Sequence, residues 1–312
     1  MGKRLGIAAL LTTLLVCLGF VLQWMLWSDG SLEPANISAA SSSPASSPPA
    51  GSGARADRGI PIEVRGSVEY RRGTESWHRL GTGVELDLDT EVRTGRDSMA
   101  RIRLGPAVTV ELASDTSINI AQLSATLSRV RLQDGRLVSE VEPDRGVRFR
   151  VQVQGSDAEA ESGSGRFAVL RADESRAVVA VEHGTVAVSA AGKRIQLEQG
   201  EQTIVRPGAP PSPPMKLPAS LVLKLARIPP SRLRGSTVEI AGETAPGAQV
   251  SIGSGVTAAD EEGRFASSVA LVDGPNEIVV EVQDVLGRKN RARLPRIIVD
   301  ARPPPPKSKA IW

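Results

Sequence analysis

Few residues in this chain of 312 could carry covalent, acid–base or metal chemistry. The chain has one cysteine, Cys17, and two histidines, His78 and His183. A site built on several cysteines or several histidines therefore cannot be assembled. His183 follows Glu182 with no nucleophile motif around it, so no catalytic triad is predicted there. We expect no metal and no other cofactor.

A short acidic series is the strongest candidate for a cation site or an acid–base pair. Asp87, Asp89 and Glu91 alternate along a predicted strand, which would place the three carboxylates on one face. An EF-hand loop is excluded because Val92 and Ser98 stand where that loop needs glycine and glutamate. We interpret the series as a solvent-exposed strand face.

Two other motifs resemble functional loops only in part. Asp260, Glu261 and Glu262 precede Gly263 in a predicted turn, where the alternatives are calcium binding and an ordinary turn. The GSG stretch at 163–165 is followed by neither Lys-Ser/Thr nor a helix signal, so it is not a phosphate loop. No catalytic residue is predicted, and we expect that the protein is not an enzyme.

The charge pattern offers one basic stripe but no nucleic-acid surface. Arg145, Arg148 and Arg150 alternate with apolar residues, and this stripe faces either solvent or an anionic polymer, lipid headgroup or acidic protein. Of the 38 Lys and Arg residues, only Lys3 and Arg4 precede the apolar N-terminal run, which leaves 36 against 35 acidic residues. Aromatic residues are 3% of the chain. Interspersed charge and few stacking rings exclude nucleic acid as an expected partner.

The elements that must position these side chains are strands. Ile62, Val64 and Val68 share one face of a predicted strand, and the same period-two alternation recurs as far as residue 205. Glycines punctuate the pattern where turns are needed. We predict one all-β domain over 61–206 and a second, smaller β unit over 236–300.

The N-terminus is predicted to be a transmembrane signal anchor. Residues 6–27 form an uncharged run of 22 residues, long enough to span a bilayer. Residues 1–5 include Lys3 and Arg4, so the positive-inside rule keeps this stub in the cytoplasm and exports the remainder. A cleaved signal peptide is the alternative. Lipidation of Cys17 is disfavoured because Val16 precedes it.

Three segments have linker composition. Residues 28–60 are dominated by Ser, Ala, Pro and Gly, which predicts a disordered tether. Residues 207–235 begin in a proline-rich stretch and are predicted to be an extended spacer between two folded regions. Residues 301–312 are expected to be a proline-rich basic tail.

The first β region resembles the FecR domain, a periplasmic β domain. Trp77 and Gly83, followed by VRTGRDSMARI at 92–102, resemble its core motif. The segment GSGRFAV at 163–169 keeps the Phe and Val of the family's G-T-x-F-x-V segment but not its Gly-Thr pair. The resemblance covers about 61–206 and implies a twisted, solenoid- or sandwich-like β domain.

Within this motif, the resemblance leaves two roles open for the charged and polar residues. Trp77 is expected to be a buried anchor. Arg93, Thr94 and Asp97 belong either to a structural turn or to a partner contact. The candidate contact residues are therefore Arg93, Thr94, Asp97, Arg145, Arg148 and Arg150.

The second β unit resembles a bacterial Ig-like accessory domain. The matching residues are Pro246-Gly247-Ala248, the DEEGRF stretch at 260–265, and Asn276. The resemblance implies a small β-sandwich over 236–300. The complete fold expected is thus all-β: a FecR-like domain, an Ig-like sandwich and one N-terminal transmembrane helix.

Three functions follow as expectations. The first is a binding or scaffolding protein of the bacterial envelope, anchored in the inner membrane through 6–27, with its bulk in the periplasm and an envelope protein or wall polymer as partner. The second is a FecR-type signalling component that regulates a sigma factor through another subunit, since residues 1–5 are too few to form an interface. The third is a carbohydrate-binding accessory protein, which the scarcity of aromatic side chains disfavours.

Overall fold

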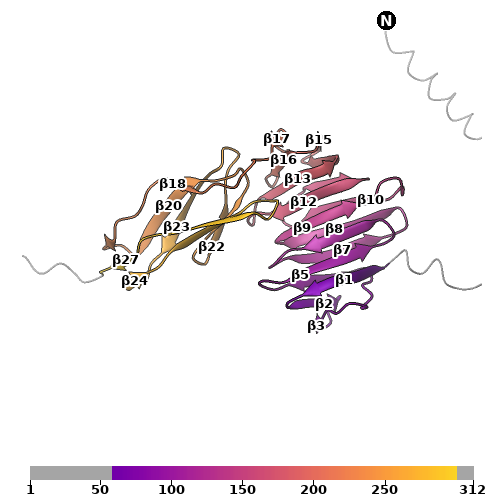
Figure 1. The fold of residues 1–312 in the computed structure, drawn as a ribbon, viewed down its shortest axis with the longest axis horizontal. Coiled ribbons are helices and arrows are strands. Elements are labelled where there is room, and N and C mark those ends of the chain that lie inside the picture. The colour runs from indigo at the N-terminus through magenta and orange to yellow at the C-terminus, as the bar shows by residue number, and fades with distance from the viewer. Residues whose placement is uncertain (1–57, 301–312) are drawn as a thin grey trace, which may run out of the picture. The chain divides into compact units, whose positions relative to one another are not determined.

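The computed structural model describes residues 58–300, and these residues form strands without any helix (Figure 1). The predicted membrane span 6–27, residues 28–57 of the predicted tether and the predicted tail 301–312 lie outside the described residues. Between residues 58 and 300, no helix meets the length and apolar character needed to cross a bilayer. The predicted all-β class is confirmed for this part of the chain.

The first module, residues 58–217, contains two open sheets. The eight-stranded sheet has the spatial order β1 (Gly59–Arg65), β5 (Met99–Leu104), β6 (Val108–Leu112), β9 (Arg136–Val141), β12 (Gly165–Arg171), β13 (Ala177–Gly184), β16 (Glu201–Val205) and β17 (Met215–Lys216). The nine-stranded sheet has the order β15 (Lys193–Leu197), β14 (Val186–Ala190), β11 (Glu159–Ser162), β10 (Arg148–Val153), β8 (Leu127–Asp134), β7 (Ser117–Leu123), β4 (Thr90–Thr94), β2 (Val68–Arg72) and β3 (His78–Arg79).

The chain crosses repeatedly between the two sheets, so both grow together along the sequence. Figure 1 shows the strands as successive rungs from β1, β2 and β3 to β15, β16 and β17. Neighbouring strands are antiparallel except β8 and β10, which pair in parallel. This architecture agrees with the expected solenoid- or sandwich-like β domain.

One apolar core holds the two sheets together. Alternate side chains of both sheets are buried in a single cluster, in which Phe149 of β10 and Phe167 of β12 lie with ring centroids 6.1 Å apart. Alternation places many β-branched residues on the inner faces of the strands, where their stiff side chains have little rotamer freedom to lose on burial. The period-two pattern read from the sequence is therefore the pattern of core burial for most strands. The prediction for Ile62 is wrong, because a register shift between Pro61 and Glu63 in β1 leaves its side chain 42% exposed.

The second module encloses its own, smaller core with three sheets. The first contains β18 (Lys224–Leu225), β20 (Thr237–Glu243) and β23 (Arg264–Ala270). The second contains β19 (Arg232–Leu233), β27 (Ile297–Val299) and β24 (Gly274–Asn276). The third contains β22 (Gly255–Ala258), β21 (Gln249–Ile252), β25 (Val279–Gln283) and β26 (Lys289–Arg293).

The proline-rich segment 207–235, predicted to be an extended spacer, is mostly exposed but contacts the two modules at several points. It contributes β17, β18 and β19 to their sheets. The buried Ser212 hydroxyl accepts a hydrogen bond from the backbone N–H of Ile204 at 3.0 Å. Arg288 donates to the carbonyl oxygens of Pro218 and Ala219, each at 2.8 Å. Proline removes backbone donors but leaves carbonyl acceptors, which these side chains use.

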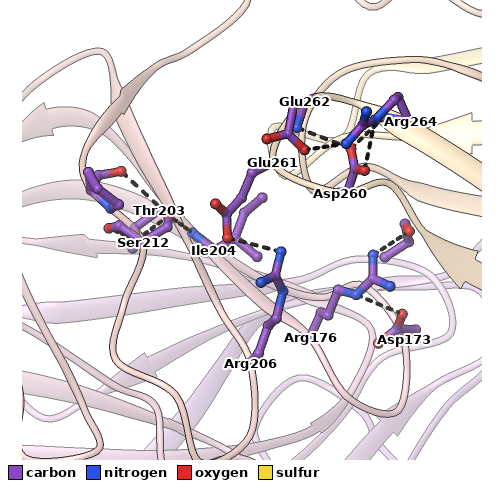
Figure 2. A network of polar contacts seen from close by, with 12 residues as sticks. Asp173, Arg176, Thr203, Ile204, Arg206, Ser212, Asp260, Glu261, Glu262 and Arg264 are labelled. Atoms are coloured by element: carbon purple, nitrogen blue, oxygen red, sulfur yellow. Dashed lines mark hydrogen bonds and ion pairs between the residues drawn. The ribbon is translucent and has the colours of Figure 1, made fainter.

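The two modules share a third apolar cluster. The outward-facing side chains of β9, β12, β13 and β16 pack with Ala258 and Val285 of the second module. Polar contacts surround this cluster: Arg206 pairs with Glu261 at 3.0 Å, and Arg176 donates to the Ala258 carbonyl at 2.5 Å (Figure 2). Strands β12 and β13 are consequently buried on both faces. Their near-continuous apolar runs are typical of that environment.

A glycine contact tests whether this interface couples the modules. At Gly247 (φ +71°), an added Cβ would lie 2.8 Å from Cγ2 of Val178 and 3.1 Å from Ile204, whereas Gly253 (φ +61°) has open space. Both Gly247→Ala and Gly253→Ala carry the cost of a left-handed alanine. We expect Gly247→Ala to lower the free energy of unfolding by about 1–2 kcal/mol more, because the methyl group overpacks the interface. Denaturant unfolding of both variants measures the difference. Equal losses would contradict a tightly packed interface.

Candidate interaction face of the nine-stranded sheet

The polar face of the nine-stranded sheet, directed away from the core, is the candidate functional site. We call it the outer face. The inward side chains of β7, β8 and β10 are buried, so the alternating residues of these strands project outward. Three of the six predicted contact residues lie on this face, namely Arg93, Arg148 and Arg150. The other three, Thr94, Asp97 and Arg145, lie in or beside turns.

Arg93 lies on the outer face in a cluster with Trp77. Its guanidinium lies 3.9 Å from the Trp77 ring centroid and pairs with Glu69 at 2.7 Å. On the same ring, the guanidinium of Arg71 lies 4.6 Å from the centroid and pairs with Glu91 at 2.6 Å. The prediction that Trp77 is a buried core anchor is wrong, because the ring is only half-buried and stacks with arginines instead.

Thr94 and its neighbours form a structural turn. The buried Thr94 hydroxyl donates to the Ala113 carbonyl at 2.5 Å and accepts from the Thr116 N–H at 2.9 Å. Ser98 Oγ accepts from the Ser67 N–H at 2.9 Å. Asp97 is exposed with a φ of +54°, a conformation that aspartate tolerates better than most residues. The turn thus buries Thr94 and leaves the Asp97 side chain accessible.

The predicted basic stripe divides between a turn and a strand. Arg145 precedes β10 and lies 3.5 Å from Glu142. Arg148 and Arg150 both lie on the outer face of β10 and approach one carboxylate, Glu161 of β11, at 3.8 and 2.5 Å. Arg148 and Arg150 therefore lie beside an acidic side chain of the neighbouring strand β11.

Sequence reasoning missed two arginines on the neighbouring strand β8. The parallel register places Arg129 beside Arg150 and Arg131 beside Gln152. Among the described residues, neither Arg129 nor Arg131 has a carboxylate oxygen within 4.0 Å. Nε of Arg129 is buried and has no hydrogen-bond partner within the same part of the chain. The signal was the outward alternation in SRVRLQ at 128–133, which matches many solvent-exposed strands.

The local electrostatics are set by one shared carboxylate. Burial raises the pKa of Glu161, but hydrogen bonds from Arg194 and Arg150 outweigh it and hold that pKa below the ordinary 4.5. Arg194 of β15 lies 3.2 Å from the Glu161 carboxylate. Glu161 is thus ionised at neutral pH, and its single negative charge is shared by three arginines and cannot balance all of them.

The acidic series and the histidines do not converge on a reactive centre. Glu91 pairs with Arg71, Asp87 lies 3.6 Å from Arg72, and Asp89 occupies a turn with φ +60°. Over residues 58–300, no three His, Cys, Asp or Glu side chains are grouped to hold a metal ion. His78 and His183 are exposed and belong to different sheets.

The acidic turn of the second module is internally paired. Asp260 accepts from the Arg264 N–H at 2.7 Å, and its other oxygen accepts from the Arg264 guanidinium at 3.1 Å (Figure 2). Glu261 pairs with Arg206 across the module interface. Burial raises the pKa of Asp260, but its hydrogen bonds with Arg264 hold it below the ordinary value. These carboxylates stabilise a turn and an interface.

Comparison with known proteins finds one family model that matches part of the first module. A family model described as "FecR protein" matches residues 90–187, which run from β4 into β14. No curated protein matches the chain. This domain match agrees with the resemblance of the motif at 92–102.

Solved structures give low overall similarity. Two crystal structures, each of a protein provisionally described as an anti-sigma factor from Parabacteroides distasonis ATCC 8503, match at 22% and 21% identity with TM-scores of 0.34. Each match covers 41% of this chain and 58% of the other chain. A tetra-tandem repeat from the extending region of a large adhesion protein matches at 12% identity with a TM-score of 0.23, covering 79% of this chain and 92% of that one.

The depressed pKa of Glu161 gives a pH-dependent contribution to stability. A carboxyl whose pKa falls on folding stabilises the protein above its ordinary pKa, and this contribution is lost as the pH falls through the folded-state value. We expect Glu161→Gln to lower the free energy of unfolding by about 1 kcal/mol at pH 7. The difference from the wild type should shrink below pH 4.5, towards the depressed pKa.

Urea unfolding between neutral and acidic pH measures this difference. Glu142→Gln is the matched control, because Glu142 is exposed and lies 3.5 Å from a single arginine. It should change stability little at any pH. A Glu161→Gln deficit that stays constant as the solution is acidified would contradict the role assigned to the ionised carboxylate.

Proposed function

We propose that this chain is an extracytoplasmic component of a FecR-type signalling system, which binds a protein partner and regulates a sigma factor through another subunit. The observation that carries the proposal is the FecR family match at 90–187. That range includes β8, β10 and β11, which form the centre of the outer face. A β module with a large polar face is suited to recognition by surface complementarity.

The proposal includes an anchored arrangement. Residues 6–27 would cross the inner membrane, and residues 58–300 would lie in the periplasm. Residues 236–300 would form the Ig-like module, an assignment supported by three small sheets around one core. The apolar cluster shared by the two modules would present both as one rigid ligand-binding unit.

The proposed role is non-enzymatic. Among the described residues, the candidate acids lie in ion pairs and turns, and the two histidines lie on different sheets. The Ser76 hydroxyl lies 3.5 Å from Nε2 of His78, but both side chains are exposed. We expect binding rather than catalysis from these surfaces.

The second candidate function is an envelope scaffold without a signalling output. The shared apolar cluster favours it, because rigidly joined modules suit a structural spacer as well as a receptor. A carbohydrate-binding role has weaker support. Tyr70 and Trp77 are the aromatic side chains nearest the surface of the described chain, and arginines stack on both.

Transcript profiling separates signalling from scaffolding. We expect deletion of the gene to change the transcripts of a sigma-factor-dependent set of genes, and expression of the full chain to restore them. Ile120→Asp, which places a charge in the core, should fail to restore them. Leu88→Asp is the matched control in the same module, because Leu88 is 53% exposed. Unchanged transcripts together with altered envelope integrity would favour the scaffold instead.

A further inference from the structure

The outer face carries an unbalanced group of arginines. We define the arginine face by Arg129 and Arg131 of β8, Arg148 and Arg150 of β10, and Arg194 of β15. Glu159 and Glu161 of β11 are the acidic residues that pair with this group. Five arginines against two glutamates leave a surplus of three positive charges. Elsewhere on the outer face, Arg71 and Arg93 each have a carboxylate of their own.

The surplus positive charge is concentrated where β8 and β10 pair in parallel. Arg129 and Arg150 are direct neighbours across β8 and β10, so two like charges lie side by side. Like charges on neighbouring strands repel, and Glu159 and Glu161 pair with Arg150 but not with Arg129, so the charge of Arg129 is not balanced locally. Nε of Arg129 is a buried donor that has no hydrogen-bond acceptor among the described residues, which is a second sign that an anion is lacking here. The protein thus maintains an arrangement that an external anion would stabilise.

The shape of the region suits an extended ligand. A hollow of about 540 Å³ lies beside Arg131 and Gln152, and a second of about 300 Å³ lies beside Arg148 and Arg194. Asp157 lines the first hollow, where its carboxylate accepts the Ala191 N–H at 2.5 Å. Arginines two residues apart on a strand present their side chains at intervals of roughly 6–7 Å. This spacing matches carboxylates on alternate residues of an extended peptide.

The chemistry of the face selects a carboxylate-bearing partner. The planar guanidinium forks of arginine recognise carboxylates through paired hydrogen bonds. Glu159 and Glu161 already pair with Arg148, Arg150 and Arg194, so the carboxylates of a partner are expected to bind mainly Arg129 and Arg131. No aromatic side chain belongs to the arginine face over the described residues, which disfavours stacking on sugar rings.

We infer that the arginine face of the nine-stranded sheet binds an acidic segment of a protein partner. This inference rests on the proposed function, in which the partner is a protein of the signalling system. It assigns the recognition to Arg129 and Arg131 in particular. Within residues 58–300, no carboxylate oxygen lies within 4.0 Å of either arginine, so binding of the ligand there breaks no ion pair of the described chain.

Binding of a defined acidic peptide tests the inference. Fluorescein-labelled poly-L-glutamate is titrated with the full chain in a non-ionic detergent, and fluorescence anisotropy is recorded. We expect saturable binding that weakens as salt is added, because screening reduces attraction between exposed charges. Arg129→Gln with Arg131→Gln should weaken binding by about tenfold or more, because charge-assisted hydrogen bonds are lost. The single variant Arg131→Gln, at an exposed position, should lose an intermediate amount of affinity. It keeps the test valid if the double variant misfolds.

A matched control carries the same charge change on the other sheet. Arg65→Gln with Arg103→Gln alters two exposed arginines of β1 and β5 and should leave the affinity unchanged. Equal loss in both double variants would overturn the inference by showing a response to net charge alone. Preference for labelled polygalacturonate of equal charge would also overturn it, in favour of a polysaccharide.

The binding result is independent of the transcript result. Arginine-dependent binding together with unchanged transcripts in the deletion strain would contradict the proposed function but support the binding role of the arginine face. Altered transcripts together with unaffected binding by the Arg129 and Arg131 variants would contradict the arginine face and leave the proposed function intact.

Discussion

The apolar core between the two sheets is the interaction on which the rest of the structure depends. Every second residue of the strands is committed to it, so the remaining residues must form the two outward faces of the first module. A shift of one residue in register would exchange core and surface along a strand. Phe149 and Phe167 contact each other across the sheets, and thereby place Arg148 and Arg150 outward.

The outward face of one sheet is covered and that of the other is exposed, because their side chains differ. On the eight-stranded sheet, Ala168, Leu170 and Val178 are apolar, and the second module covers them. On the nine-stranded sheet, charged side chains occupy the corresponding positions and no described segment covers them. The first face therefore joins the modules, and the second is available for recognition. The fold thus separates the face that joins the modules from the face to which we assign partner binding.

The sequence supports the strand pattern and the class of the fold, because period-two alternation directly reflects burial on one face. It also indicates Arg148 and Arg150 through their alternation with apolar residues. It could not reveal Arg129 and Arg131 as part of the same surface, because the parallel pairing of β8 with β10 joins segments separated by β9, which lies in the other sheet. The run AVVAV at 177–181 was a readable sign of burial on both faces, and hence of a covering module. The proline content of 207–235 predicts an extended spacer, and the segment is mostly exposed while it pairs briefly with both modules through β17, β18 and β19.

Site-specific photocrosslinking in living cells tests most directly the central claim that the outer face of the nine-stranded sheet meets a protein partner. A photoreactive residue at Gln152, beside Arg131, should yield one discrete protein adduct from the full chain. The same residue at Thr109, on β6 of the eight-stranded sheet, should not yield that adduct. The adduct from position 152 should disappear when Arg129 and Arg131 are replaced by glutamine. An adduct formed at position 109 alone, or one at 152 that persists without the two arginines, would contradict the account.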